Sequence, residues 1–558
     1  VNLDVEYKRA LGQYMYYRNP DGHDVRVIDF IGGFGAGIFG HNNPELKSVL
    51  LKSIHADKPF NAQASYRAGA AKVAEKLCEI MSEKFDERFI SIFGNTGTEA
   101  VEIALKHAEL CHIQKVRETL TKLNHRFYEK ITAVEKGELE LSPDFTDKYN
   151  QYFGRSERSL DLRNAWNSIK DSNERSLLKR PYFLSLKSAF HGKTTGAVQL
   201  TFNCKYREAF TRIGPDVKFV EPENSQDINR AIEECTIDYI SPALDEKGRL
   251  TLTRIPYTNI SGFFVEPIQG EGGVHILSKD YMRHCRDYAT KYGFPLILDE
   301  IQCGMGRTGS FFYSEQQGVI GDYYLLSKSL GASYGKISVV LVREKLYNSD
   351  FDLMHSSTFA EDDYSTAVSL RGMELLTDSP EMIDEIHERG IYLFERLNKL
   401  KARYPEVIRE VRGAGLMIGL ELDVEHPASP LIGCLVDQNM LGWVIAGFML
   451  QKFQIRIAPT LSNSNTLRLQ PPACITEEDC DFLCVGLDAL CSILSRGNSY
   501  ALTEFLLPPS TSKPENEALI KSYRAAYSQP ANVPDDIHHV GFIGHFAQAA
   551  DISKWDQG

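Results

Sequence analysis

The sequence lacks closely spaced cysteine pairs, although 11 cysteines are scattered over its 558 residues. An odd number without a CxxC pair does not fit a disulfide framework, so we expect free thiols and a cytoplasmic protein. Cys480 and Cys484 are spaced as neighbours on one face of a helix. Because no second pair of ligands is nearby, we interpret them as part of a buried helix and expect no metal site.

Long apolar runs and an excess of positive charge are also absent. No apolar stretch reaches the roughly 18 residues of a membrane span, and no signal peptide opens the chain. The formal net charge of −13 argues against a nucleic acid as partner, because a phosphate backbone attracts basic proteins. The chain starts at Val1 rather than at methionine, so we expect it to be a piece of a longer protein.

The composition, with 43% hydrophobic and 25% charged residues, is ordinary for a globular protein of several units. Residues 1–60 are expected to form an N-terminal segment that packs with the smaller domain. Residues 61–345 form a large domain, interrupted at 108–180 by a charged insertion of surface helices. Residues 346–500 form a smaller α+β domain. Residues 501–558 contain a Pro/Ser-rich linker and the start of a further domain or tail.

Short apolar runs separated by helical patterns predict an α/β fold with a mostly parallel sheet covered on both faces. In such sheets ligands bind beyond the carboxyl ends of the strands. Asp299 and Lys328 both follow apolar runs, so we expect them at that edge. The five clearest strand candidates are residues 182–186, 217–220, 262–265, 295–298 and 338–342.

Lys328 and Asp299 together match the needs of pyridoxal phosphate chemistry. A lysine amine forms an imine with the aldehyde of this cofactor, and an aspartate keeps the ring nitrogen protonated. Lys328 follows the apolar residues 323–326, so we expect a buried strand end that lowers its pKa and makes the amine nucleophilic. A single lysine is far more often a surface residue, and it is the combination with Asp299 that favours the functional interpretation.

Other parts of the cofactor have candidate partners as well. Small residues at 93–100 lead into a helical pattern, where Gly97 and Thr98 would offer backbone N–H groups to a phosphate, with Thr96 nearby. A plain capped helix explains these residues equally well. Phe190 follows a strand and would stack on a flat ring, although by itself it fits the core as well. Gln302 would reach the phenolic oxygen of the ring.

In their order and spacing these residues resemble the class III pyridoxal-phosphate aminotransferases of fold type I, over roughly residues 10–490. The resemblance implies a mostly parallel, seven-stranded type of sheet in the large PLP-binding domain, with a smaller α+β domain. The motifs that carry it are residues 95–100 (NTGTEA), 190–192 (FHG), 266–273 (EPIQGEGG), 299–309 (DEIQCGMGRTG) and Lys328.

The resemblance also implies roles for individual residues. Lys328 would form the internal aldimine and shuttle the proton, while Thr358 would reach the cofactor phosphate of the other subunit of a homodimer. Phe34 and Tyr66 would line the substrate pocket, and Arg468 would bind a substrate carboxylate through its fork of donors. The full set expected to bind the cofactor is Thr96, Gly97, Thr98, Phe190, His191, Glu266, Asp299, Gln302, Lys328 and Thr358.

Two departures from the family concern the partners. Residues 360–363 (AEDD) stand where the family has small, glycine-containing residues, which alters the expected dimer contact. Residues 540–546 weakly resemble the opening strand of fatty acyl carrier-protein reductases. This resemblance implies a fused reductase domain or an acyl carrier protein as partner, and an acyl-derived aldehyde as acceptor in a multidomain biosynthetic enzyme.

The sequence thus predicts an aminotransferase that moves an amino group from a donor amine or amino acid to an aldehyde or keto acceptor. Two alternatives stay open. The same fold and cofactor also serve aminomutases, racemases, decarboxylases and lyases, because a fold does not determine a reaction. In the second alternative, the chain is a non-catalytic dimerisation module of a larger assembly.

Overall fold

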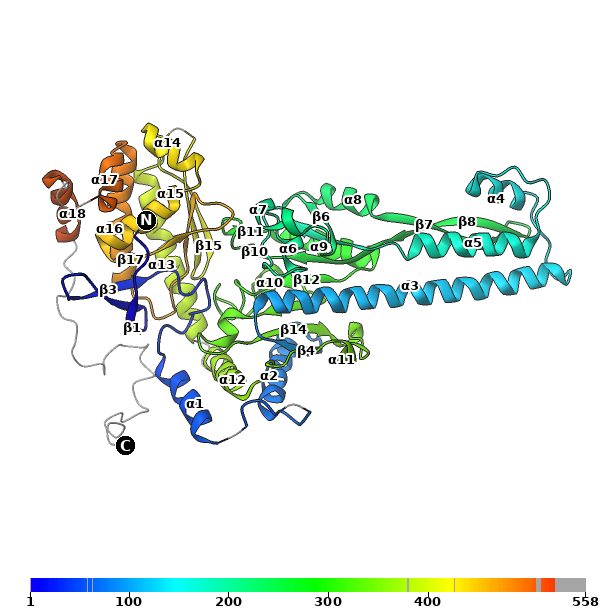
Figure 1. Ribbon diagram of the computed structural model, residues 1–558, viewed down its shortest axis with the longest axis horizontal. Helices are drawn as coiled ribbons and strands as arrows, with labels where there is room; N and C mark the ends of the chain where they lie inside the picture. The colour runs from blue at the N-terminus through cyan, green and yellow to red at the C-terminus, as the bar shows by residue number, and fades with distance from the viewer. Residues whose placement is uncertain are drawn as a thin grey trace.

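The computed structural model describes residues 2–57, 59–62, 64–378, 381–425, 427–507 and 513–526. It has a broad body from which a long arm projects, to the right in Figure 1. The body contains a large sheet, a smaller sheet and an N-terminal sheet. Residues 540–546, which resemble a reductase strand, lie outside the described residues.

The large domain is built on a seven-stranded sheet with the strand order β4-β14-β13-β12-β9-β5-β6. Five adjacent strands, from β13 to β6, run parallel, and β14 runs antiparallel to both of its neighbours. The predicted α/β fold with a mostly parallel sheet is confirmed. The strands are β4 (Phe89–Gly94), β5 (Tyr182–Leu186), β6 (Asp216–Val220), β9 (Ile260–Val265), β12 (Leu296–Asp299), β13 (Tyr323–Leu326) and β14 (Ser338–Arg343).

Both faces of this sheet are buried, which explains why its strands are continuously apolar. Leu296 and Leu298 of β12 face one hydrophobic cluster, and Ile297 between them faces another. This alternation follows from the two-residue period of a strand. The first face is covered by α2 (Ala68–Phe85), α8 (Ser225–Glu234) and α9 (Lys279–Tyr292), and the second by α3 (Gly97–Glu135) and α6 (Ala197–Leu200).

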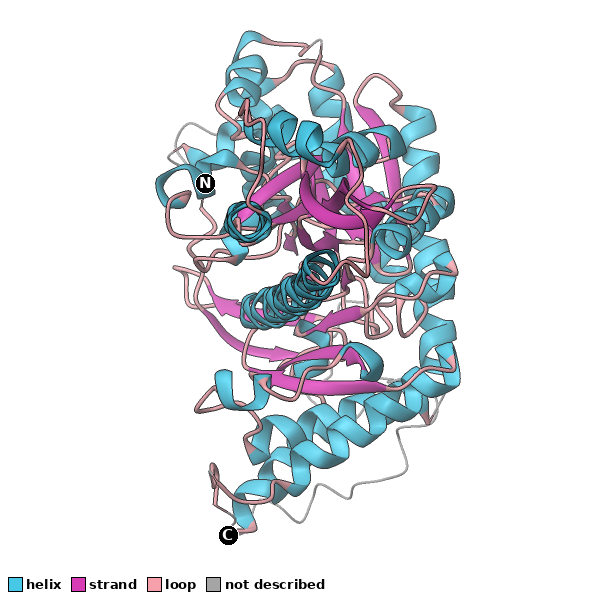
Figure 2. Cartoon of the chain, turned by 90° about the vertical axis from the view of Figure 1, so that its right-hand side faces the viewer, coloured by secondary structure: helices cyan, strands magenta, loops and turns pink. Residues whose placement is uncertain are grey.

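The arm begins where α3 leaves the sheet. With 39 residues, α3 is roughly 58 Å long at the usual rise per residue. It is joined by α4 (Phe145–Phe153), α5 (Leu162–Leu177) and a hairpin of β7 (Thr236–Leu244) and β8 (Leu250–Thr258). Figure 2 looks along the arm, with its helices end-on. The arm has its own core, made by residues such as Phe127, Tyr149, Ile169 and Leu252.

The smaller sheet has the order β15-β16-β19-β18 and is antiparallel throughout. Its strands are β15 (Ile408–Ala414), β16 (Met417–Leu422), β18 (Ala458–Pro459) and β19 (Thr466–Leu469). Helix α12 (Asp363–Thr377) packs against α2 and the turn that begins at Lys328. The helices around the smaller sheet are α13 (Glu381–Arg403), α14 (Pro430–Asp437), α15 (Leu441–Phe453), α16 (Glu477–Ser495), α17 (Ser499–Thr503) and α18 (Pro514–Ala526). Residues of α13, α15 and α16 belong to the same hydrophobic cluster as β16 and β19.

The N-terminal strands are tied to this smaller domain through the backbone. β17 (Ile455–Arg456) pairs in parallel with β3 (Asp24–Asp29), and β1 (Tyr7–Leu11) and β2 (Tyr14–Arg18) complete that sheet. α1 (Pro44–His55) follows a glycine-rich loop, residues 31–40. The remaining short elements are β10 (Ile268–Gln269), β11 (His275–Ile276), α7 (Cys204–Arg207), α10 (Tyr313–Gln317) and α11 (Phe351–Met354).

Among the described residues no single helix combines the length and hydropathy that a membrane span needs. The adjacent helices α14 and α15 meet these criteria only when taken together, and they are bent by 113°.

Candidate active site

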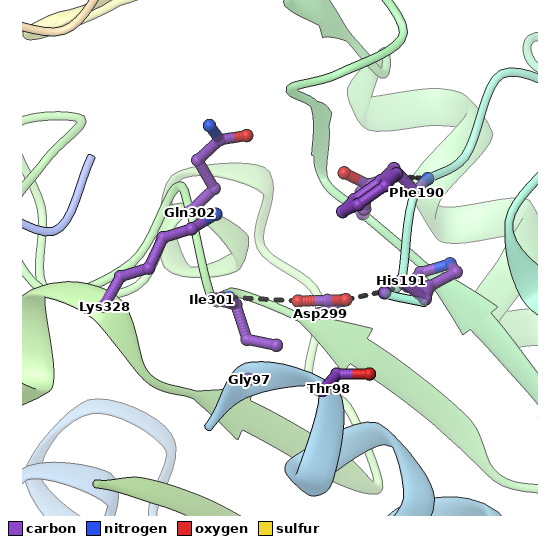
Figure 3. A pocket seen from close by; sticks show the side chains of 10 residues that line it. Gly97, Thr98, Phe190, His191, Asp299, Ile301, Gln302 and Lys328 are labelled. Carbon is purple, nitrogen blue, oxygen red and sulfur yellow. Dashed lines mark hydrogen bonds and ion pairs between the residues drawn. The ribbon is translucent and has the colours of Figure 1, made fainter. Parts of the chain in front are cut away.

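A cavity of about 200 Å³ opens at the carboxyl ends of β9, β12 and β13. Figure 3 shows Lys328 and Gln302 on one side, His191 and Phe190 on the other, and Asp299 between them above the start of α3. The cavity therefore unites most of the residues that the sequence singled out. It is lined by Gly97, Thr98, Phe190, His191, Gly192, Glu266, Asp299, Ile301, Gln302 and Lys328.

Lys328 stands two residues after the end of β13, at the first position of a short 3₁₀ turn, with a φ of +46°. Residues other than glycine rarely adopt this left-handed backbone conformation, so contacts with the surrounding structure must stabilise it at Lys328. The hydroxyl of Ser327 donates to Ile337 O at 3.0 Å, and that of Ser329 donates to Gly35 O at 2.9 Å. Burial lowers the pKa of the Lys328 amine, in spite of nearby Glu271 and Asp299. The neutral amine is a nucleophile.

Asp299 is the last residue of β12 and is buried. One carboxylate oxygen accepts from Ile301 N at 3.1 Å, and the other lies 2.7 Å from Nδ1 of His191. Burial disfavours the charged imidazole, but the hydrogen bond to Asp299 and its charge outweigh this, so the pKa of His191 is raised. Nε2 of His191 has no hydrogen-bond partner among the described residues.

Glu266 joins Phe190 to the turn that follows β9. One of its oxygens accepts from Phe190 N at 2.9 Å and the other from Gly270 N at 3.3 Å. Burial, together with the charge of Asp299, raises the pKa of Glu266 to about 7, against the opposing effect of His191. Glu266 thus fixes the backbone of Phe190, whose side chain lines the cavity.

The start of α3 forms one end of the cavity, where Gly97 and Thr98 line it. Thr96 is the N-cap, and its hydroxyl accepts from Glu99 N at 3.3 Å. Thr194 donates its only hydroxyl proton to Glu102 at 2.5 Å, so Thr98 Oγ1, 2.8 Å away, must donate to Thr194. The N–H groups at the first two positions of the helix, those of Gly97 and Thr98, have no partner within the helix, and such groups are suited to bind an anion.

Gln302 crosses from the large domain to the smaller one. Its Nε2 donates to Oε1 of Gln470 at 3.1 Å, and both side chains are buried. Gln470 follows β19 and is 0% exposed. A carboxamide nitrogen has two N–H donors, so the contact with Gln470 leaves one donor of Gln302 unused.

Arg468, in β19, forms a buried ion pair with Glu271. Its Cζ also lies 4.6 Å from the centre of the Phe34 ring, and Phe34 itself has a φ of +57°. Nε and Nη2 of Arg468 have no hydrogen-bond partner among the described residues. The guanidinium is therefore held at one nitrogen and keeps two donor nitrogens for a ligand.

Five predicted residues are not among those that line this cavity in the single chain: Thr358, Tyr66, Thr96, Phe34 and Arg468. Thr358 is exposed, and its carbonyl accepts from Asn61 Nδ2 at 2.7 Å. Tyr66 is 84% exposed in the loop before α2. Thr96 also lies just outside the lining, because its side chain caps α3.

Sequence reasoning assigned no role to Glu271, Gln470, Thr194 or Glu102. Glu271 stands inside the motif at residues 266–273, and Gln470 stands two residues after Arg468, but nothing in the sequence shows which residue a buried arginine or glutamine meets. Glu102, one turn along α3, accepts from Gly196 N and Ala197 N as well as from Thr194. Only the three-dimensional structure relates α3 to that loop.

The residues around the cavity fit the separate parts of pyridoxal phosphate. Backbone donors suit the phosphate, Phe190 the ring face, Asp299 the ring nitrogen, and the Lys328 amine the aldehyde. The comparisons with known proteins point the same way. The chain is similar in structure to ornithine aminotransferase from Toxoplasma gondii, with a TM-score of 0.62, 20% identity, and coverage of 89% of this chain and 92% of that chain.

Two further solved structures have the same fold. One is an amine transaminase from an uncultivated Pseudomonas species in its PLP-bound form, with a TM-score of 0.63, 20% identity, and 88% and 95% of the two chains covered. The other is a Bacillus anthracis aminotransferase, with a TM-score of 0.63, 21% identity, and 88% and 94% covered.

The family model for aminotransferase class-III matches residues 1–491. The predicted cofactor, pyridoxal phosphate, and the predicted reaction class, amino transfer, are thereby confirmed. The chain belongs to the class-III aminotransferase family.

Proposed function

We propose that Lys328 carries the cofactor of this aminotransferase and moves the proton during amino transfer. The observation that carries the proposal is the burial of the Lys328 amine in the same cavity as Asp299, with its pKa lowered by that burial. Bound pyridoxal phosphate supplies an electron-accepting ring that stabilises charge on the substrate carbon. The neutral amine of Lys328 takes a proton from that carbon and returns it as a general acid.

Asp299 keeps the ring nitrogen protonated in this proposal, and His191 orients Asp299. The 2.7 Å contact with His191 and the hydrogen bond from Ile301 N leave the carboxylate little freedom. Phe190 covers one face of the ring, since Glu266 fixes its backbone at 2.9 Å. Gln302 donates to the ring oxygen with the N–H that Gln470 does not use.

The phosphate is bound by the backbone N–H groups of Gly97 and Thr98. The hydroxyl of Thr98 donates to Thr194 instead, because Thr194 donates its own proton to Glu102. The partial positive charge at the N-terminus of α3 adds to the attraction.

Arg468 binds the carboxylate of a substrate. Two of its nitrogens are without partners among the described residues, and a guanidinium fork matches a carboxylate. Glu271 neutralises the guanidinium at its third nitrogen. The ion pair with Glu271 uses neither free nitrogen, so it stays intact with or without a substrate carboxylate, and the same pocket accepts both kinds of amine or carbonyl compound.

The active unit in this proposal is a homodimer. Leu353 is 95% exposed, Phe359 60% and Tyr66 84%, and large apolar side chains are rarely so exposed without a partner. Thr358, next to Phe359, then reaches the phosphate of the partner subunit's cofactor. Light scattering should give twice the mass of one chain, and Leu353→Asp should lower it.

All 11 cysteines are free thiols, which supports a reducing compartment such as the cytoplasm. Fractionation of cells that express the protein tests this location. The partners in this proposal are an amine donor and a carbonyl acceptor. An acceptor screen that includes long-chain aldehydes tests whether acyl-derived aldehydes are used.

A single experiment tests the central proposal. Purified protein loaded with pyridoxal phosphate is mixed with amine donors, and the cofactor absorbance is followed as the amino group is transferred. Borohydride reduction and peptide mapping then locate the bound cofactor, which should be on Lys328. Lys328→Ala should lose turnover by at least about a thousandfold and keep its circular dichroism spectrum. Cofactor on another lysine, or full turnover in Lys328→Ala, would contradict the proposal.

A further inference from the structure

Gln470 lies two residues after Arg468, at the end of β19. Side chains alternate between the two faces of an extended chain, so residues two positions apart project to the same side. Arg468 contacts Phe34 and Glu271, while Gln470 contacts Gln302. The two side chains therefore approach the active site together, from the smaller domain.

Three donor groups on these two side chains are buried without a partner among the described residues. They are Nε and Nη2 of Arg468 and Nε2 of Gln470, on residues that are 1% and 0% exposed. Leaving buried N–H groups unpaired costs free energy, so such groups indicate a ligand with acceptor atoms. A carboxylate has two acceptor oxygens and a negative charge, and it suits this set of donors.

The structure leaves space beside the free nitrogen of Gln470. Gly35, in the glycine-rich loop, has a φ of +92°, and a Cβ there would lie 3.4 Å from Oε1 and 3.6 Å from Nε2 of Gln470. A side chain at position 35 would fill this space. The carbonyl oxygen of Gly35 accepts hydrogen bonds from Ser329 and Arg307, and it accepts none from Nε2 of Gln470.

The other end of the Gln470 carboxamide already has a partner. Oε1 accepts from Nε2 of Gln302 at 3.1 Å, and Gln302 lines the cavity. Because the donor and the acceptor of a carboxamide are separate atoms, Gln470 is able to contact a carboxylate and Gln302 at the same time. A carboxylate on Nε2 polarises the amide and strengthens Oε1 as an acceptor.

We propose that Gln470 forms a carboxylate-binding subsite with Arg468 and that it couples occupation of this subsite to Gln302. Gln470 is then a specificity residue for substrates with a carboxylate, and a positioning residue for the hydrogen bond from Gln302 to the cofactor ring oxygen. The inference rests on the proposed function, because it places Gln302 beside the cofactor and a substrate carboxylate at Arg468.

Two substitutions of similar length separate these contacts. Gln470→Met removes both the free donor and the acceptor for Gln302. Gln302→Met keeps the free donor of Gln470 and removes the contact between the two glutamines, together with the donor to the cofactor ring oxygen. Both variants, the double variant and the unsubstituted protein are loaded with pyridoxal phosphate, and circular dichroism verifies their fold. Calorimetry gives the dissociation constants of butanoate and of butanamide, which has the same length and no charge.

Gln470→Met should weaken butanoate binding by about tenfold or more, since one hydrogen bond to a charged group is lost, and should leave butanamide binding unchanged. Gln302→Met should weaken butanoate binding by less than Gln470→Met does, because the donor to the carboxylate remains and only its coupling to Gln302 is lost. In the unsubstituted protein, butanoate but not butanamide should shift the pH at which the cofactor absorbance changes. Neither variant should show this shift.

A purely structural role for Gln470 would weaken both ligands alike, and this result would overturn the inference. Unchanged butanoate affinity in folded Gln470→Met would also overturn it. If Gln470→Met does not fold, the unsubstituted protein decides, because equal shifts with butanoate and butanamide contradict the coupling. If borohydride does not label Lys328 in the unsubstituted protein, the proposed function itself fails, and the two failures are distinguished.

Discussion

Glu271 forms an ion pair with Arg468 at a place where the guanidinium is covered on one side by the ring of Phe34. The second oxygen of Glu271 accepts from Leu461 N at 3.0 Å, so the carboxylate is held from two sides. Arg468 is only 1% exposed. Breaking a buried pair leaves an uncompensated charge, while replacing both partners by apolar residues is often tolerated.

The stability of variants should follow this rule. We expect Arg468→Met to lower the free energy of unfolding by about 3–5 kcal/mol, because Glu271 is left buried and unpaired. The double variant Arg468→Met/Glu271→Met should recover most of the loss in urea unfolding. Arg409→Met is the control, since Arg409 pairs with Asp423 and Glu425 at the surface and should change stability by only about 0–1 kcal/mol. Equal losses in the single and double variants would refute the expectation.

The phosphate site is tested by removing one backbone N–H. Gly97 is the first residue of α3 and follows Thr96, which is extended with φ −139° and ψ 158°, so proline fits this backbone. Any Cβ at position 97 would lie 3.1 Å from the side chain of Ile301, which makes Gly97→Ala the matched control. We expect Gly97→Pro to bind pyridoxal phosphate about tenfold more weakly than Gly97→Ala, measured by equilibrium dialysis. Equal affinities would show that this N–H does not bind the phosphate.

Much of the site could be predicted because chain position and chemistry coincide at the sheet edge. Lys328 and Asp299 each follow a continuously apolar strand, and the parallel arrangement brings the ends of β12 and β13 together. Gly97, Thr98, Phe190 and Gln302 line the same cavity for the same reason. The apolar pattern that places these residues at strand ends is visible in the sequence, whereas the order of the strands in the sheet comes from the structure.

What could not be predicted depends on contacts between distant segments. The partner of Gln302 is 168 residues away, and the partner of Arg468 is 197 residues away. The hairpin of β7 and β8 was not predicted to be part of the arm. Its strands are distant from the helical insertion along the chain and pack against it only in the folded structure. Its residues Ile240 and Leu252 pack with Phe127 of α3, a contact that local periodicity does not encode.

Lys328 should make the stability of the cofactor-free protein depend on pH. Burial lowers its pKa in the folded state below the ordinary 10.5, so between these two values the unfolded state binds more protons. Stability therefore rises with pH through this window. We expect cofactor-free Lys328→Met to be more stable than the unsubstituted protein at neutral pH, and the difference to disappear above about pH 10.5. Urea unfolding over a pH series measures this, and a difference independent of pH would contradict it.

The pair of His191 and Asp299 should give a pH dependence of the opposite sign. Burial lowers the pKa of His191, but the hydrogen bond and charge of Asp299, with a smaller contribution from Glu266, raise it above the ordinary 6.5. The stabilisation from the pair is complete below pH 6.5 and is lost as the pH rises through the raised pKa. In Asp299→Asn the charge is gone and burial prevails, so the pKa of His191 should fall below 6.5.

This fall in the pKa of His191 is measurable by NMR titration of the cofactor-free protein, with His191→Phe identifying the signal. The free energy of unfolding should decrease with pH above pH 6.5 in the unsubstituted protein by more than in Asp299→Asn. A pKa of His191 that does not change in Asp299→Asn would show that Asp299 does not control its charge. His191 would then be unable to orient Asp299 through a charged contact.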